Sequence, residues 1–151
     1  MTTRLVFALT LNMLFITSGC AKLSNAKWAE INGNRFNIEV ADTNELRQRG
    51  LMFRRDMASD TGMLFIHDNL SPVAYWMKNT YIPLDILYFD EQLKLVSAQL
   101  NVPPCGEHTQ CPNYPSNGPV KYVLEVNAGI AEKIQLKKND QLILSESVMV
   151  K

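Results

Sequence analysis

Residues that usually carry chemistry are scarce in this sequence. It contains two histidines and three cysteines, and its seven glycines form neither a Gly-x-Gly-x-x-Gly pattern nor a Walker-type phosphate loop. No Gly-x-Ser-x-Gly segment is present either. The sequence therefore gives no support to nucleotide binding or serine hydrolysis, and it predicts no cofactor and no complete set of metal ligands.

A surplus of positive charge is also absent. The 15 Lys and Arg residues are balanced by 15 Asp and Glu residues, and no basic stripe runs along the chain. Binding to nucleic acid depends on such a surplus, because neutralising phosphates supplies most of the sequence-independent affinity. We therefore expect no nucleic-acid partner.

A long apolar run occurs near the N-terminus and has the flanks of an export signal. Arg4 precedes the run, Leu5 to Ile16 form it, and the small residues Thr17-Ser18-Gly19 lead to Cys20. A helix of this run spans about 18 Å, which is short of the ~30 Å hydrocarbon layer of a membrane. We therefore predict that residues 1–19 are a signal peptide and not a transmembrane anchor.

Cys20 lies where a bacterial lipoprotein carries the cysteine that is lipidated after cleavage. We expect a lipid at Cys20, which attaches the protein to the membrane, and a tether over residues 20–27. Thr17 departs from the aliphatic residue that the cleavage box prefers, so ordinary cleavage after Ala26 is the alternative. Ala21 resembles the outer-membrane sorting preference of Gram-negative lipoproteins. The predicted location is the periplasmic face of the outer membrane, or the soluble periplasm if no lipid is attached.

With Cys20 assigned to a lipid, Cys105 and Cys111 remain as a pair in a proline-rich segment. In an oxidising compartment such a pair is expected to form a disulfide, and the chain-entropy model gives about 2.4 kcal/mol of stabilisation for a loop of this length. Cys105, His108 and Cys111 also have the spacing of three zinc ligands, but a fourth ligand is missing nearby. We therefore predict a disulfide and no metal site.

The periodicity of apolar residues predicts a β-rich domain over residues 28–151. Residues 28–31 and 35–41 flank the turn-prone triplet Asn32-Gly33-Asn34 and predict a hairpin. The other predicted strands are 62–66, 73–78, 84–89, 93–100, 120–126 and 141–149, and short helices are predicted over 43–49, with Asp42 and Glu45 as a capping box, and over 129–136. This content predicts a mainly β (α+β) fold, either a compact, twisted, partly closed barrel or two packed sheets with about two short helices.

Polar and charged residues interrupt the apolar block from Trp76 to Asp85. Burying Lys78 or Asp85 without a partner would cost several kcal/mol, so we expect these groups to be paired or to face a ligand. Glu125 interrupts another apolar strand in the same way. We predict a mixed-charge ligand pocket with an aromatic stacking surface, made by Arg54, Trp76, Lys78, Asn79, Asp85 and Glu125, with Tyr75 beside Trp76.

Four segments occur in an order that resembles a known family. They are Gly50-Leu51-Met52-Phe53-Arg54, Gly62-Met63-Leu64-Phe65, the block from Trp76 to Asp85, and Val123-Leu124-Glu125-Val126-Asn127-Ala128-Gly129. Together they are similar to the bacterial and archaeal domain-of-unknown-function 192 family, also called uncharacterised protein family 0127, over about residues 36–143. The segment 105–115 looks like an insertion in that pattern. The resemblance implies a compact, mostly β domain of undetermined activity and supplies no catalytic residues.

These observations predict an uncharacterised cell-envelope protein with a non-catalytic binding or accessory role. The expected ligand is small and polar, such as a saccharide or another envelope component. One alternative is a glycan-acting hydrolase that uses Asp85 and Glu125, which requires the two carboxyl groups to lie about 5 to 9.5 Å apart. The other alternative is a structural protein of the envelope that binds a protein partner. The oligomeric state does not follow from the sequence.

Overall fold

The computed structural model describes residues 26–106 and 110–149. The predicted signal peptide, Cys20 and His108 therefore lie outside the described residues. Within the described ranges, no helix combines the length and the apolar content that crossing a membrane requires.

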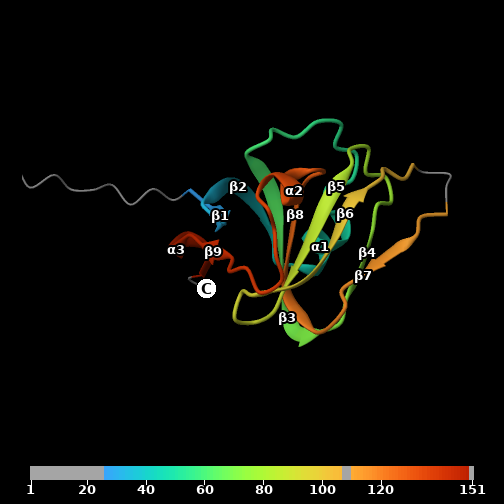
Figure 1. The fold of residues 1–151 in the computed structure, drawn as a ribbon. Coiled ribbons are helices and arrows are strands. Elements are labelled where there is room, and N and C mark those ends of the chain that lie inside the picture. Colours follow the sequence, from blue (N-terminus) through green and yellow to red (C-terminus); the bar gives the residue numbers. More distant parts are fainter. Residues whose placement is uncertain (1–25, 107–109, 150–151) are drawn as a thin grey trace, which may run out of the picture.

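A curled sheet of seven strands forms the body of the molecule (Figure 1). Its spatial order is β6-β5-β8-β3-β2-β1-β9, and all neighbours are antiparallel except β2 and β3. The strands are β1 (Trp28–Ile31), β2 (Asn34–Ala41), β3 (Thr61–Ser71), β5 (Leu84–Phe89), β6 (Leu95–Val102), β8 (Val120–Asn127) and β9 (Ile143–Leu144). A second, small sheet pairs β4 (Ala74–Trp76) with β7 (Asn113–Pro115). The predicted mainly β fold with a partly closed sheet is confirmed.

The predicted hairpin at the start of the domain is also confirmed. β1 and β2 pair antiparallel on either side of Asn32 and Gly33. Both residues have positive φ, 50° for Asn32 and 74° for Gly33, which is the backbone of a two-residue type I′ turn. Asn and Gly are the residues that adopt this conformation most readily, so the sequence pattern identified the turn correctly.

In the described ranges, three short helices accompany the sheets: α1 (Asn44–Arg49), α2 (Ile130–Lys133) and α3 (Glu146–Met149). The cap of α1 is Thr43, whose hydroxyl accepts a hydrogen bond from the backbone N–H of Leu46, so the predicted cap at Asp42 is wrong by one residue. The predicted strand over 141–149 is also wrong beyond Leu144. There the carbonyl of Ser145 accepts from the N–H of Val148, which starts the turn of α3.

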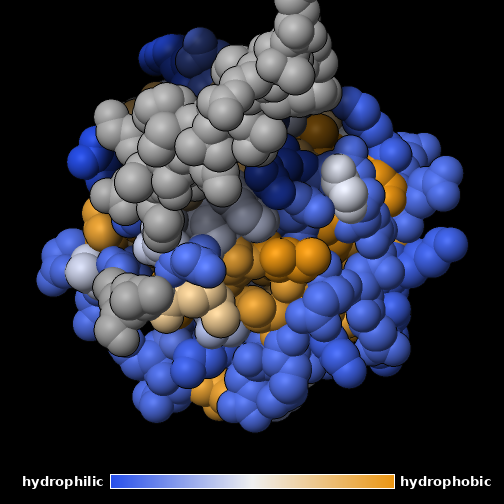
Figure 2. Space-filling model, turned by 90° about the vertical axis from the view of Figure 1, so that its left-hand side faces the viewer, coloured by the Kyte–Doolittle hydropathy of each residue, from blue (hydrophilic) through white to orange (hydrophobic). Residues whose placement is uncertain are grey.

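The main sheet buries apolar residues on both of its faces. One face carries Leu87, Phe89, Leu124 and Val126 and is packed against residues of α2, β1 and the C-terminal segment. The other face carries Ile86, Tyr88 and Val123 and is packed against the turn after α1, the block around Met77, and the disulfide segment. Figure 2 shows that apolar residues also come to the surface in the middle of one otherwise mostly hydrophilic side of the molecule.

The predicted disulfide between Cys105 and Cys111 is confirmed, with the two Cα atoms 5.9 Å apart. The backbone N–H of Cys105 donates to the carbonyl of Thr80 at 3.2 Å, so the disulfide segment is attached to the polar block that contains Lys78 and Asn79. In the described part of the chain, no group of three or more His, Cys, Asp and Glu side chains is placed to hold a metal ion.

Candidate functional site

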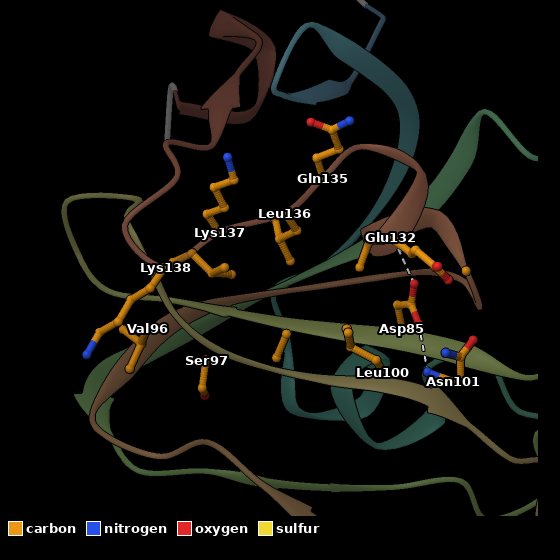
Figure 3. A pocket seen from close by; sticks show the side chains of 14 residues that line it. Asp85, Val96, Ser97, Leu100, Asn101, Glu132, Gln135, Leu136, Lys137 and Lys138 are labelled. Carbon is orange, nitrogen blue, oxygen red and sulfur yellow. Dashed lines mark hydrogen bonds between the residues drawn. The ribbon is translucent and has the colours of Figure 1, made fainter.

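Asp85 is buried completely in β5, and both of its carboxyl oxygens accept hydrogen bonds. One oxygen accepts from the backbone N–H of Asn101 in β6 and the other from the backbone N–H of Ala131 in α2, each at 2.8 Å (Figure 3). Two N–H donors compensate the cost of burying the carboxylate. Asp85 therefore links the edge strand β6 to α2 and has a structural part in the fold.

Asp85 also lines a pocket of about 440 Å³ between β6 and the segment that follows α2. The walls of this pocket are mainly apolar, and in Figure 3 Leu136 points from that segment toward β6. None of the other predicted ligand-binding residues lines it.

The register of the sheet separates Asp85 from Glu125. Asp85 in β5 lies opposite Val126 in β8, and the next residue, Ile86, lies opposite Glu125. Directly opposed residues project to the same face, and successive residues of a strand project to opposite faces. The Glu125 side chain therefore leaves the sheet on the face opposite to that of Asp85, and the structure does not bring the two carboxyl groups into one pocket.

Glu125 lies at the wall of a different cleft, which we call the Glu125 cleft. The inner part has a volume of about 110 Å³ and is lined by α1 and the turn after it, by β4, and by Lys78 and Thr80. An outer part of about 540 Å³ is lined by Gln48, Met52, Trp76, Lys78 and Asn79. Four of these residues line both parts, so the two parts lie next to each other.

The carboxyl group of Glu125 is held in a low-dielectric environment. The residue is 4% exposed, and no hydrogen bond to its carboxyl group is found within the described ranges. Burial raises the pKa of Glu125 to about 8, because the charged form loses its hydration. At neutral pH the group is therefore mostly a neutral carboxylic acid, which donates one hydrogen bond as well as accepting others.

Trp76, Lys78 and Asn79 line the outer part of this cleft. Trp76 is half-exposed, and the Lys78 Nζ lies 5.2 Å from the centroid of its ring. Asn79 has a positive φ of 57°, and its Oδ1 is buried with no hydrogen-bond partner among the described residues. A buried acceptor without a partner is uncommon in a folded protein, and here it lies beside the residues that line the outer part of the cleft.

Arg54 lies beside the Glu125 cleft and does not line it. Its guanidinium forms an ion pair with Glu39 at 2.7 Å, in a neighbouring hollow that shares Arg49, Gly50 and Met52 with the cleft. Of the six residues predicted for one pocket, the structure thus brings four together: Trp76, Lys78, Asn79 and Glu125.

Several groups near the Glu125 cleft could not be recognised from sequence patterns. The Arg47 guanidinium donates to the carbonyls of Asp42 and Ile66 and pairs with Asp68 at 3.1 Å. The Tyr75 hydroxyl lies 3.0 Å from Nε2 of His67. Burial raises the pKa of Tyr75 well above its ordinary range, and the nearby Glu125 adds to this effect. For His67, by contrast, burial lowers the pKa, because the charged form of histidine is the protonated one.

The local backbone explains how the cleft is built. A Cβ atom at Gly62 of β3 would lie 2.6 Å from the backbone oxygen of Glu125, so glycine allows these strands to meet closely. The N–H of Phe53 donates to the carbonyl of Asn79 at 2.6 Å, and both residues have positive φ. This bond holds the turn after α1 against the polar block, and such uncommon backbone conformations often occur at binding sites.

Comparisons with known proteins agree with this fold. The model of the family DUF192, described as "Uncharacterized ACR", matches residues 27–144. A crystal structure from Sinorhizobium meliloti 1021, described as a "putative transcription regulator", is 36% identical, covers 79% of this chain and 94% of its own, and has a TM-score of 0.71. A protein of unknown function from Novosphingobium aromaticivorans DSM 12444 is 30% identical, covers 78% and 83%, and has a TM-score of 0.70. Among curated proteins, no match was found.

Proposed function

This chain belongs to the DUF192 family of uncharacterised proteins, and we propose that it binds a small polar ligand in the Glu125 cleft. The observation that carries the proposal is an almost fully buried carboxyl group, whose pKa burial raises to about 8, at the wall of a cleft that opens to the surface. Such a group costs stability, and perturbed groups of this kind concentrate at functional sites.

The shape and lining of the cleft suit a small molecule. The inner part has room for one polar group, and the outer part lies in the size range of small-molecule pockets. The indole of Trp76 offers a flat apolar surface, while Lys78, Asn79 and Glu125 offer a cation, an amide and an acid. This combination supports a ligand with a polar head and a flat or apolar body.

A glycan hydrolase that uses Asp85 and Glu125 together has no support from the geometry. The two side chains leave opposite faces of the sheet, and both oxygens of Asp85 are engaged by backbone N–H groups. Two carboxyl groups must flank the same glycosidic bond for that chemistry. Binding without a carboxylate pair is therefore the function that we propose.

The description of the Sinorhizobium relative as a regulator raises the question of contact with nucleic acid. The balance of 15 basic and 15 acidic residues gives such contact no support, because non-specific affinity for phosphate backbones requires an excess of basic residues. We therefore propose no nucleic-acid partner for this chain.

The proposed setting of the protein is the cell envelope, with a lipid on Cys20. The support comes from the apolar run before Cys20 and from the pairing of the other two cysteines with each other. Mass spectrometry of protein recovered from membranes tests this proposal. A diacylglyceryl adduct on a peptide that begins at Cys20, which Cys20→Ser abolishes, is expected. An unmodified mature protein that begins after Ala26 would show that the alternative cleavage is used.

A thermal-shift screen tests ligand binding. We would compare the wild type with Lys78→Met and with Lys138→Met, because both lysines are exposed but only Lys78 lines the Glu125 cleft. The panel contains saccharides, organic acids, amino acids and phosphate esters. A ligand at about 100 times its Kd adds about 2.7 kcal/mol of stability, which raises the melting temperature by several degrees. We expect this rise in the wild type and in Lys138→Met and a smaller one in Lys78→Met; equal rises in all three proteins would contradict the proposed site.

A further inference from the structure

The charges that line the Glu125 cleft are mainly positive. Arg47, Arg49 and Lys78 line it, and Glu125 is its one carboxylate-bearing residue among the described residues. Arg47 is engaged by Asp68 and by two backbone carbonyls. Within the described part of the chain, neither Arg49 nor Lys78 forms an ion pair, and Lys78 contacts the ring of Trp76. The cleft therefore presents two cations, Arg49 and Lys78, that form no ion pair with a carboxylate of the described residues.

Glu125 does not neutralise these cations at neutral pH. Burial raises the pKa of its carboxyl group to about 8, so at neutral pH the group is mostly protonated and offers an O–H donor to the cleft. A hydrogen bond from a carboxylic acid to an anionic oxygen is short and among the stronger hydrogen bonds in proteins. A cationic ligand, by contrast, would meet Lys78 and Arg49 and gain no ion pair from a neutral acid.

From this lining we propose that the ligand of the Glu125 cleft is a small organic carboxylate, whose charge meets Lys78 and whose oxygen accepts a hydrogen bond from the Glu125 carboxyl group. The flat or apolar body of the ligand lies against the Trp76 indole in the outer part of the cleft. This inference rests on the proposed function and adds the charge and chemical class of the ligand. A saccharide without an acid group would leave the cations of the cleft unused.

The arrangement makes binding depend on pH. When the pH rises above about 8, Glu125 ionises, loses its donor and repels the carboxylate of the ligand. If the ionised form does not bind, the decrease in affinity approaches tenfold per pH unit once the pH is well above 8. The other titratable or charged groups around Glu125 are Tyr75 from β4, Tyr88 from β5, Arg47 and Arg49 from α1, and Lys78, and His67 from β3 contacts the Tyr75 hydroxyl. Burial raises the pKa of both tyrosines and lowers that of His67, so these three are not expected to titrate between pH 7 and 9.

Calorimetric titration of the purified protein with benzoate, benzamide and glucose tests the inference. Benzamide has the shape of benzoate without its charge, and glucose is a neutral saccharide. We expect benzoate to bind at pH 7 at least tenfold more tightly than benzamide or glucose, and about tenfold more weakly at pH 9 than at pH 7. Lys78→Met should weaken benzoate binding about tenfold or more, whereas the matched control Lys138→Met should leave it unchanged.

Glu125→Gln separates the role of the proton from the shape of the cleft. Glutamine keeps a donor but does not titrate, so benzoate should bind this variant with an affinity that does not change between pH 7 and 9. If glucose binds as tightly as benzoate and Lys78→Met weakens it, the proposed function stands and the inference about charge is wrong. The inference is also overturned if none of the compounds binds, or if benzoate has the same affinity for Lys78→Met and for the wild type.

Discussion

Asp85 and Glu125 lie on neighbouring strands, one register step apart, and their side chains leave opposite faces of the same sheet. Asp85 is held by two backbone N–H groups and joins β6 to α2, whereas Glu125 meets a cleft without a hydrogen bond among the described residues. Two acidic residues that look equivalent in the sequence therefore have different roles. The first stabilises the fold, and the second is the centre of the proposed ligand site.

The raised pKa of Glu125 predicts how stability depends on pH. The carboxyl group of the unfolded chain titrates near 4.5 and that of the folded chain near 8, so the folded state binds more protons between these values. The free energy of unfolding should therefore fall as pH rises from 4.5 to 8, by at most about 1 kcal/mol per pH unit. Urea denaturation of the wild type and Glu125→Gln at several pH values measures this difference. Glu132→Gln, at an exposed position of α2, is the control. If the free energy of unfolding changes with pH in the same way in the wild type and in Glu125→Gln, the raised pKa of Glu125 is wrong.

Asp85→Asn is predicted to destabilise the protein and to leave the Glu125 cleft intact. The amide of the asparagine directs its NH2 group at one of the two backbone N–H donors, those of Asn101 and Ala131. One buried hydrogen bond is therefore lost, and the other is made to a neutral instead of a charged oxygen. We expect a loss of about 3 kcal/mol in the free energy of unfolding, measured by urea denaturation. A folded Asp85→Asn protein that no longer binds a ligand of the wild type would show that Asp85 belongs to the site.

Gly62→Ala is predicted to damage the sheet beneath the cleft. The added Cβ would lie 2.6 Å from the backbone oxygen of Glu125, so β3 and β8 must move apart. We expect a loss of more than about 2 kcal/mol, or insoluble protein. Gly106→Ala is a suitable control because its Cβ would meet no atom within 4 Å. Equal melting temperatures for the two variants would be inconsistent with the close approach of these strands.

Removal of the disulfide is predicted to lower stability and to loosen the polar block. The double variant Cys105→Ser/Cys111→Ser should lose about 2.4 kcal/mol by the chain-entropy model. Cys105 donates to the carbonyl of Thr80, so the backbone near Lys78 and Asn79 should exchange its amide hydrogens faster in this variant. Calorimetry and hydrogen exchange measure the two effects. A reductant should shift the wild type toward the variant and leave the variant unchanged; if it destabilises both equally, the loss does not come from the disulfide.

Much of the fold was predictable because its signals are local. The Asn32-Gly33 turn, the alternation of Phe36, Ile38 and Val40, and the apolar run of β5 each depend on a few adjacent residues. The end of the chain was predicted less well. The segment after Leu144 has the apolar content of a strand, but the carbonyl of Ser145 accepts a hydrogen bond from the N–H of Val148, which starts α3. The strand β7 was not predicted, because it contains Pro115 and lies in a segment rich in proline.

The site was only partly predictable, because its residues come from segments that lie far apart in the sequence. The block that contains Trp76, Lys78 and Asn79 is continuous in the sequence, and the structure keeps these residues together. The placement of Asp85 was not predictable, because every residue of β5 is buried and no alternation shows which face each occupies. The register between β5 and β8 decides the faces of Asp85 and Glu125, and it joins segments that lie far apart in the chain.

The most direct test of a ligand site in the Glu125 cleft is the mapping of NMR chemical shifts. We would titrate the ¹⁵N-labelled protein with benzoate and, separately, with glucose. We expect at least one of them to shift the Trp76 indole N–H and the amides of Met52 and Asn79, while the amides of Asn101 and Ala131 beside Asp85 stay in place. Shifts that centre on Asn101, Ala131 and Leu136, or spectra that neither compound changes at millimolar concentration, would contradict the proposed site.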